Sequence, residues 1–335
     1  MQDAATLERD TALHRSVRVA IVIPAYNEAV AIGQTIADYA AAFPEASIVV
    51  IDNNSRDGTS AAAAPFLRPG RDFLLSEPRQ GKGFAIKRGL SRAMADIFIM
   101  TDGDATYPAA DARRLFDHML ASRADMIVGD RRAGGTYMSQ NERFGHSFGN
   151  AMLTTVISGL AGQKFNDVLS GLRIMSLPFV EALDIRSEGF QLETELNIVA
   201  AHLRADVIEV PVDYVARPAG SQSKLSTFRD GFRILTFALL NWIAFLPLQF
   251  FSVVACIGWC IAAALGYRVI AGFLESGWPY STTAVAAASA AIVGTLSWFS
   301  GLTLKVQGRA SRRRETADFL RRKREWNERL DDILL

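Results

Sequence analysis

The 335-residue chain has few cysteines, few histidines and almost no net charge. Its two cysteines, Cys256 and Cys260, lie in one apolar run, so a disulfide scaffold is excluded and we expect two buried, inert thiols. With four histidines and no paired Cys/His cluster, a structural zinc site is not expected. The formal net charge of +1 argues against a general nucleic-acid-binding protein, which is usually basic.

The sequence also lacks two glycine-rich phosphate-binding motifs. Its first apolar segment is followed by Pro-Ala-Tyr-Asn-Glu rather than by G-x-G-x-x-G, and no G-x-x-x-x-G-K-[ST] occurs. Gly81-Lys82-Gly83 is only a lysine between two glycines. The sequence therefore predicts neither a dinucleotide-binding fold nor a P-loop enzyme.

What the sequence does have is two long runs without a charged residue, Ile234–Tyr267 and Ser276–Leu304, which account for a mean hydropathy of +0.13. A membrane-spanning helix needs about 20 apolar residues. Because Pro247 permits a break, we expect an interfacial amphipathic helix over 226–246 and spans over about 248–267 and 283–304. Two buried core helices of a soluble protein are the alternative, although uncharged runs this long are rare in soluble domains.

Basic residues flank the two predicted spans on one side. Arg229 and Arg233 precede the first span, and ten Lys/Arg against four Asp/Glu lie between 305 and 330, whereas the connecting loop holds only Arg268 and Glu275. The positive-inside rule places the N-terminal part and the tail in the cytoplasm. No signal peptide is expected, because the first apolar run follows a mixed-charge stretch and contains Pro24.

The basic tail also carries an apolar stripe. Phe319, Trp326, Leu330 and Ile333 are spaced by seven, four and three residues, which fits one face of a helix. The stripe can lie on the anionic inner leaflet of a membrane or pack on the N-terminal domain, and the sequence does not decide between them. We therefore expect four segments: a water-soluble domain over 1–225, the interfacial helix over 226–246, two transmembrane helices over 247–304 and a tail helix over 305–335.

The N-terminal part alternates predicted strands with predicted helices. Apolar, β-rich runs at 17–24, 47–52, 72–75, 95–101 and 125–129 predict strands, and helical periodicity falls at 28–43, 83–94 and 109–122. A polar turn at 53–59 leads into a further short helix. This order predicts an α/β fold, with a mostly parallel sheet and helices on both faces. Ligands of such sheets bind at the carboxyl ends of the strands, where the polar motifs of this chain gather.

The motif Asp102-Gly103-Asp104 directly follows one of these strands. Two carboxylates in a short loop can hold a hard divalent cation such as Mg²⁺ or Mn²⁺ together with phosphate oxygens. Asp52 follows the second strand and Lys82 follows the third. Acids and a lysine converging on one edge of a sheet suit a nucleoside diphosphate with its metal.

Four segments then carry a family resemblance: VAIVIPAYNEAVAIGQTI, VVIDNNSRDGTS, GKGFAIKRGL and IFIMTDGDATYP. As a set they resemble the inverting glycosyltransferase family 2, which has a GT-A fold, over about 17–236. With the two predicted spans, the chain resembles the membrane-bound polyprenyl-phosphate glycosyltransferases, which include the dolichol-phosphate mannose synthases. The resemblance implies a nucleoside diphosphate sugar as donor, a polyprenyl phosphate (undecaprenyl or dolichyl) as acceptor, Mg²⁺ or Mn²⁺ as cofactor, and no nucleic acid as partner.

The resemblance also implies roles for individual residues. Asp102 and Asp104 match the family's D-x-D metal pair, with Asp104 favoured as the direct ligand. The positions that match the nucleotide-sugar pocket are Pro24, Ala25, Tyr26, Glu28, Asp52, Lys82, Asp102, Gly103, Asp104 and Arg217. The family's mannose synthases commonly have a Gln two residues after the second Asp, whereas this chain has Thr106. That departure puts mannose as the sugar in doubt.

On the acceptor side, related enzymes bind the lipid phosphate with arginines, and the matching candidates are Arg131, Arg132 and Arg143. Further on, Glu193 and Glu195 would point to opposite faces of an extended segment, so we expect only one of them, Glu193, to enter the site. Lys224, with Arg217 and Ser221, matches a mobile basic loop near the donor diphosphate.

Together these features predict a hexosyltransferase that needs no general base, because a lipid phosphate is already ionised at pH 7. The residues expected to act in catalysis are Asp102, Asp104, Arg131, Arg143, Lys224 and Glu193. A family 2 enzyme with a saccharide or lipid-linked glycan acceptor, and with Glu193 or Asp167 as base, is one alternative. A membrane anchor that keeps a transferase-like domain without activity is another. Because two spans per chain can leave an incomplete interface in the bilayer, a homo-oligomer is a further expectation.

Overall fold

The computed structural model describes residues 17–133, 154–155, 158–159, 164–189, 191–218, 236, 240, 243, 246–278 and 280–334. The chain divides into two compact units. The first comprises Met1–Ile234 with Glu315–Leu335, and the second comprises Leu235–Arg314. The predicted interfacial helix over 226–246 falls almost entirely outside the described residues.

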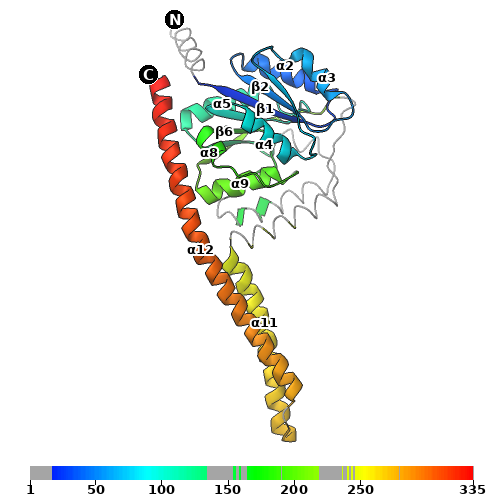
Figure 1. Ribbon diagram of the computed structural model, residues 1–335, viewed down its shortest axis with the longest axis vertical. Coiled ribbons are helices and arrows are strands. Elements are labelled where there is room, and N and C mark those ends of the chain that lie inside the picture. Colours follow the sequence, from blue (N-terminus) through cyan, green and yellow to red (C-terminus); the bar gives the residue numbers. More distant parts are fainter. Residues whose placement is uncertain are drawn as a thin grey trace. The chain divides into compact units, whose positions relative to one another are not determined.

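The first unit is built on a seven-stranded sheet with the order β3-β2-β1-β4-β6-β5-β7 (Figure 1). Its strands are β1 Val19–Ala25, β2 Ser47–Asp52, β3 Phe73–Ser76, β4 Ile97–Met100, β5 Met126–Asp130, β6 Arg173–Ser176 and β7 Val207–Pro211. All pairings are parallel except those of β6, which runs antiparallel to β4 and to β5. The mostly parallel sheet is thus confirmed, and each of the five predicted strands begins and ends within two residues of its expected bounds.

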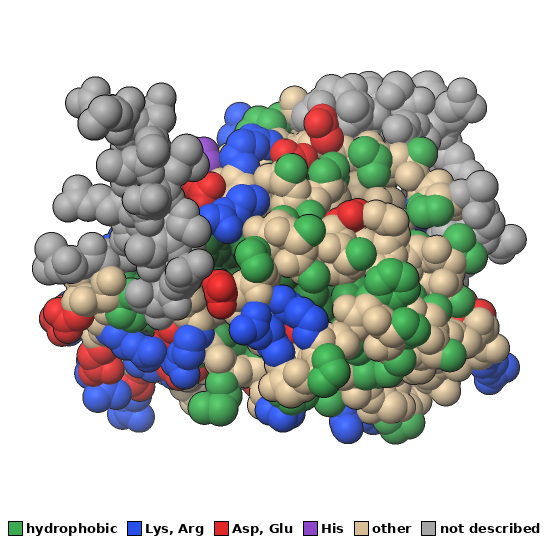
Figure 2. Space-filling model, turned by 90° about the horizontal axis from the view of Figure 1, so that it is seen from above, with side chains coloured by type: hydrophobic (Ala, Val, Ile, Leu, Met, Phe, Trp, Pro, Cys, Tyr) green, Lys and Arg blue, Asp and Glu red, His purple; other side chains and the backbone are tan. Residues whose placement is uncertain are grey.

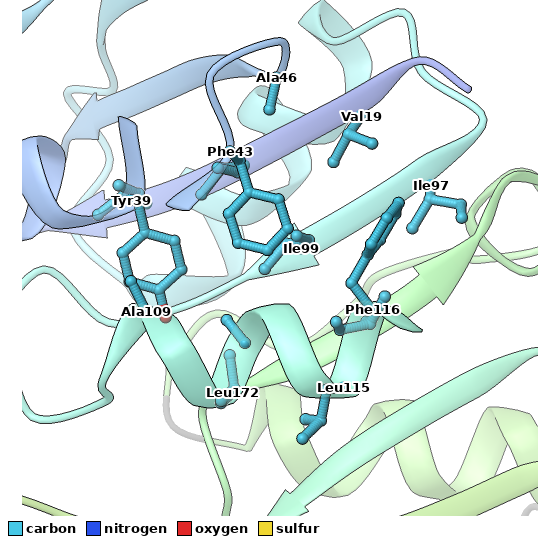
Figure 3. Packing of buried hydrophobic residues seen from close by; sticks show 14 of the residues in the cluster. Val19, Tyr39, Phe43, Ala46, Ile97, Ile99, Ala109, Leu115, Phe116 and Leu172 are labelled. Carbon is cyan, nitrogen blue, oxygen red and sulfur yellow. The ribbon is translucent and has the colours of Figure 1, made fainter. Parts of the chain in front are cut away.

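Helices cover both faces of the sheet, as predicted. They are α2 Ile32–Ala42, α3 Thr59–Ala63, the 3-10 turn η1 Ala64–Phe66, α4 Lys82–Arg92, α5 Ala109–Ser122, α8 Leu177–Glu181 and α9 Leu192–Leu203. Helices α2 and α5 pack on one face, where Phe43 meets Phe116 edge to face at 5.8 Å between ring centroids (Figure 3). Helices α4 and α9 pack on the other. On the face shown in Figure 2, acidic and basic side chains lie next to one another.

The first helix begins later than expected. Its predicted start was residue 28, but α2 begins at Ile32. The reason lies at Asn27, which has a left-handed φ of 52° and whose side-chain oxygen accepts a hydrogen bond from the Arg56 amide at 2.8 Å. These residues form a loop that is bonded to the neighbouring turn rather than the first turn of a helix.

The tail belongs to the first unit. Its part of α12 (Ser281–Leu334) buries Phe319, Trp326 and Leu330 against the sheet and its helices. The Trp326 indole donates to the Asp96 carbonyl at 3.2 Å, and Lys323 lies 2.7 Å from Asp125. Of the two placements left open for the apolar stripe, the structure therefore has the one in which it packs on the N-terminal domain.

The second unit contains α11 (Pro247–Ser276) and the first part of α12, and both are long and apolar enough to cross a membrane. Pro247 is the first residue of α11, a position where its missing N–H costs nothing. The helix continues past the predicted end at 267 to Ser276. Within the unit, Gly258 and Gly294 bring the two helices together, since a Cβ on Gly258 would lie 3.0 Å from the Gly294 Cα.

One prediction for this unit is wrong. Cys256 and Cys260 were expected to be buried, yet both are exposed on α11. So are Trp259 and Ile261, which lie on other sides of the same helix. An apolar helix that presents hydrophobic side chains all round suits a lipid environment, and there the thiols face outward with the other apolar groups.

Candidate active site

The carboxyl ends of β1, β2 and β4 meet at one edge of the sheet. Ala25 pairs with Asp52 in the register of β1 and β2, and Val22 pairs with Met100 in that of β1 and β4. These strand ends and the loops that follow them carry most of the predicted nucleotide and metal residues; Lys82 follows β3 and Arg217 follows β7. The parallel register therefore brings together positions that are about 25 to 80 residues apart in the chain.

The loops after β1 and β2 are hydrogen-bonded into one wall. The Glu28 amide donates to the Thr59 hydroxyl at 2.9 Å, and the Ala29 amide donates to Asp57 at 3.1 Å. Glu28 is buried, Ala25 is buried, and Pro24 and Tyr26 are half-buried. The residues matched to the nucleotide pocket thus lie beside one another at this edge, with backbone donors already engaged.

Asp52 stands at the base of this wall. One of its carboxylate oxygens accepts from the Ser55 amide at 2.9 Å, and the other accepts from the Ser60 hydroxyl. The side chain remains half-exposed at the carboxyl end of β2. It is therefore fixed in orientation while still open to a ligand.

The two carboxylates of the Asp-Gly-Asp motif each have a cationic partner. Lys82 Nζ lies 2.6 Å from Asp102 Oδ1, and Arg217 Nη2 lies 2.7 Å from Asp104 Oδ2. The other oxygen of Asp104 accepts from the Thr106 hydroxyl at 2.6 Å. Thr106 is fully buried, so at the position of the family's Gln this chain has a residue that orients Asp104.

Lys82 is placed by the glycines on either side of it. A Cβ on Gly83 would lie 1.8 Å from the Ser187 carbonyl oxygen, and one on Gly81 would lie 2.0 Å from that of Glu188. Gly81 also has a φ of 148°, and the Gly83 amide donates to the Glu188 carbonyl at 3.1 Å. Only glycines allow this close backbone approach, which sets the first turn of α4 against the residues that precede α9.

That approach brings Glu193 to the site. Lys82 Nζ also binds Glu193 Oε1, so the lysine bridges the half-buried Asp102 and the buried Glu193. Glu195 instead accepts from the Arg186 amide at 2.9 Å and from the Ser187 amide at 2.9 Å. Glu193 is the one that faces the Asp pair, as expected, but the assumed extended segment is wrong: both residues lie in the first turn of α9.

The charges of the cluster shift the acidity of the two aspartates in opposite directions. Burial opposes ionisation of Asp102, but the charge and hydrogen bond of Lys82 hold its pKa below the ordinary value. For Asp104, burial and then the neighbouring charge of Asp102 raise the pKa. The pKa of Lys82 is raised despite its burial, because Asp102 and Glu193 stabilise the ammonium. Asp102 is thus a stable anion beside a more basic Asp104.

The arginines predicted for the acceptor phosphate have separate places. Arg131 makes a two-point ion pair with the fully buried Asp167, at 2.7 and 2.8 Å, and lies over the Tyr214 ring. It is close enough for its charge to lower the pKa of Asp102. Arg132 is exposed and donates to the Asn166 carbonyl at 2.9 Å. Arg143, Ser221 and Lys224 lie outside the described residues.

The residues present fit a divalent cation. Asp102 and Asp104 supply two carboxylates, and Gly171 leaves room for the first, since a Cβ there would lie 2.3 Å from Asp102 Oδ2. Among the described residues, no group of three or more His, Cys, Asp and Glu could hold a metal on its own. Mg²⁺ usually binds proteins through one or two carboxylates and completes its coordination with water and substrate phosphates, and the Asp pair suits that arrangement.

Sequence reasoning missed three supporting residues. Asn53 bridges the wall to the α4 loop, accepting from the Gly81 amide at 2.7 Å and donating to the Arg79 carbonyl at 2.7 Å. Tyr107 accepts from the Gly171 amide at 2.8 Å. Arg173 is fully buried and donates to Asn197 at 2.8 Å and to two loop carbonyls; burial lowers its pKa to about 10. For Arg173, the signal in the sequence was an arginine at the first position of a short apolar segment, which is the start of β6.

Comparison with known proteins places this site in a family. Residues 20–178 match the model of glycosyl transferase family 2. The chain is 33% identical over 218 residues to glycosyltransferase AglJ of Haloferax volcanii, covering 64% of this chain and 68% of that protein. It is 28% identical over 221 residues to an undecaprenyl-phosphate mannosyltransferase of Micrococcus luteus, covering 63% and 88%.

The fold agrees with this assignment. A glucosyl-3-phosphoglycerate synthase from Mycobacterium tuberculosis, solved with Mn²⁺ and UDP-glucose, superposes with a TM-score of 0.54 at 19% identity, over 70% of this chain and 81% of that one. At this identity the likeness establishes the GT-A fold. The relatives, by contrast, are close enough in sequence to establish the reaction class, so the scaffold without activity is set aside. The chain belongs to glycosyltransferase family 2 and is a glycosyltransferase.

Proposed function

We propose that this enzyme transfers a hexose from a nucleoside diphosphate sugar to a polyprenyl phosphate at the cytoplasmic face of a membrane, with inversion at the anomeric carbon. The observation that carries the proposal is the position of Arg131. Its guanidinium lies over the Tyr214 ring, and Tyr214 packs edge to face on Tyr107, which follows the Asp-Gly-Asp motif. A cation suited to an acceptor phosphate therefore lies near the predicted metal and diphosphate site. A relative named as an undecaprenyl-phosphate mannosyltransferase supports the same acceptor class.

The donor side follows from the wall and the Asp pair. The wall after β1 and β2 would hold the nucleoside, with Asp52 toward the base, and Asp102 and Asp104 would hold Mg²⁺ or Mn²⁺. Bound there, the metal would neutralise charge on the departing diphosphate. Arg217 and Lys82 are the cations nearest that position. The Mn²⁺ and UDP-glucose in the structural neighbour are consistent with these roles.

The acceptor phosphate has to be held in position rather than deprotonated. A phosphate oxygen is already ionised at pH 7, so the attack needs no proton removal, but the anion must be kept close to an acidic metal site. Arginine suits this task because its planar group bonds phosphate oxygens at two points. Asp167 fixes the orientation of Arg131. Arg132 and Arg143 are further candidates for binding the acceptor phosphate.

A saccharide acceptor with a carboxylate base remains the second candidate. It requires Glu193 or Asp167 to accept a proton. Glu193 is paired with Lys82, and both oxygens of Asp167 are paired with Arg131. Using either carboxylate as the base would require breaking its ion pair, so these pairings favour the phosphate acceptor.

The membrane would supply that acceptor. Two helices are long and apolar enough to span a bilayer, and the basic residues between 305 and 330 favour a cytoplasmic tail. Because the tail helix packs on the first unit, both would lie on the same side. We propose that 247–304 forms a two-pass anchor and that 226–246 lies at the interface; a homo-oligomer stays a prediction.

The test is a donor screen with the purified full-length chain. Radiolabelled UDP- and GDP-sugars are offered with Mn²⁺ and either undecaprenyl or dolichyl phosphate, and label in the lipid extract is counted. We expect one donor to label the lipid, with Asp104→Asn almost inactive. Asp117→Asn, which removes an exposed acid on α5, is the matched control. Transfer only to water-soluble saccharides, or a product with retained anomeric configuration, would contradict the proposal.

A further inference from the structure

Lys82 and Arg217, which pair with the two aspartates of the Asp-Gly-Asp motif, differ in how many partners fix them. Lys82 has two carboxylate partners, begins helix α4 and is 12% exposed. Arg217 has one carboxylate partner in Asp104, is 27% exposed, and lies on the segment after β7 that has no helix or strand. Of the two, Arg217 is therefore the cation that can leave its aspartate at lower cost.

Arg217 occupies the oxygen that a metal would use. Asp104 has one oxygen bonded to Thr106 and the other to Arg217. Thr106 is fully buried and bonds Asp104 within the tight turn at Ala105, whose φ is 57°. A divalent cation that binds Asp104 therefore competes with the Arg217 guanidinium, because two positive charges at one carboxylate repel each other strongly at close range.

Arg217 also has one donor atom without a partner in the part of the chain that the structure describes. Its Nη1 atom is buried and has no hydrogen-bond partner among the described residues. An unpaired buried donor favours binding of an anion with oxygens in reach. A guanidinium that leaves Asp104 next to a bound nucleotide would find such oxygens on the diphosphate, which it can bond at two points.

We propose that Arg217 gates the metal site: it competes with a divalent cation for Asp104 until a nucleoside diphosphate draws it away. This rests on the proposed donor site. The enzyme would then bind Mn²⁺ weakly alone and much more tightly with the nucleotide, and by linkage the metal would strengthen nucleotide binding by the same factor. The gate would keep the acid pair from holding a metal that has no donor to act on.

The test measures Mn²⁺ affinity of the purified full-length chain by calorimetry or electron paramagnetic resonance, with and without UDP or GDP. Arg217→Gln removes the competing charge, Arg217→Lys keeps it, and Arg113→Gln removes a different arginine that pairs with an aspartate on α5. For Mn²⁺ alone, we expect Arg217→Gln to bind about tenfold more tightly than wild type. The other two variants should stay within about twofold of wild type.

The nucleotide separates the possible outcomes. In wild type we expect UDP or GDP to tighten Mn²⁺ binding about tenfold or more, and in Arg217→Gln we expect most of that enhancement to be lost. Unchanged or weaker binding of Mn²⁺ alone by Arg217→Gln would overturn the gate while leaving the donor site intact. Failure of wild type to bind Mn²⁺ with either nucleotide would instead overturn the proposed function.

Discussion

Lys82 and Glu193, which are 111 residues apart in the chain, form a buried ion pair between the first turns of α4 and α9. The same ammonium binds Asp102, so one positive charge holds two acids from separate elements in place. A buried pair of this kind contributes little net stability by itself, but removing one member leaves the other charge without compensation. The contribution of this three-residue ion pair is therefore best tested by replacing Lys82, the residue that both acids share.

Replacing Lys82 with methionine should destabilise the first unit. The change leaves Asp102 and Glu193 close together without the cation, and we expect a loss of about 3 kcal/mol in the free energy of unfolding. The measurement is urea unfolding of the full chain followed by tryptophan fluorescence. Adding Glu193→Gln removes one of the two acids and should restore more than half of the loss. A single variant as stable as wild type would show that the bridge is not a constraint on the fold.

Much of the fold could be predicted because its signal is local. The continuous apolar run at 19–25 and the periodic run at 109–122 are typical of a buried strand and an amphipathic helix, and both occur in the structure. Strands β6 and β7 were not predicted. They are short, and β6 is antiparallel, so it interrupts the alternation from which the other strands were inferred.

The site was predicted less completely because its geometry depends on distant contacts. Asp102 and Asp104 stand out in a motif, but nothing local indicates that Arg217 reaches Asp104 or that Glu193 lies on a helix. The placement of the tail likewise depends on a fit between Trp326 and the start of β4. Family resemblance supplied candidate residues, and the sheet register decided which of them meet.

Replacing Gly83 with alanine should weaken the donor site. The new Cβ would lie 1.8 Å from the Ser187 carbonyl, so α4 must shift and carry Lys82 away from Asp102. We expect affinity for Mn²⁺ with UDP or GDP to fall by about tenfold or more, since roughly 1–2 kcal/mol of charged hydrogen bonding is lost. Calorimetry on the full chain measures this.

The control for that change is Gly308→Ala, which places the same methyl group on α12 where nothing lies within 4 Å. It should leave nucleotide affinity unchanged and favour the helix slightly. Equal nucleotide affinity in the Gly83 and Gly308 variants would mean that the close approach to Ser187 does not position Lys82.

Removing the Thr106 hydroxyl should reduce metal binding without unfolding the protein. Thr106→Val keeps the shape of this buried side chain and removes the hydroxyl that donates to Asp104 Oδ1 at 2.6 Å, which leaves that oxygen only the Thr106 amide at 3.3 Å. We expect Mn²⁺ affinity in the presence of nucleotide to fall about fivefold, in line with one lost hydrogen bond of about 1 kcal/mol. Thr106→Ser retains the hydroxyl and should recover most of the affinity. Identical weakening in both variants would point to packing rather than to the hydrogen bond.

Truncating Trp326 should release the tail from the first unit. The indole is 4% exposed, packs in the cluster with α2 and α5, and donates to the Asp96 carbonyl. Trp326→Ala should therefore cost about 3–5 kcal/mol. Faster hydrogen exchange at residues 319–330 and at the start of β4 would locate the effect. Leu320→Ala, on the exposed side of the same helix, should change neither quantity. If the two variants unfold alike and exchange alike, the stripe does not hold the tail on the sheet.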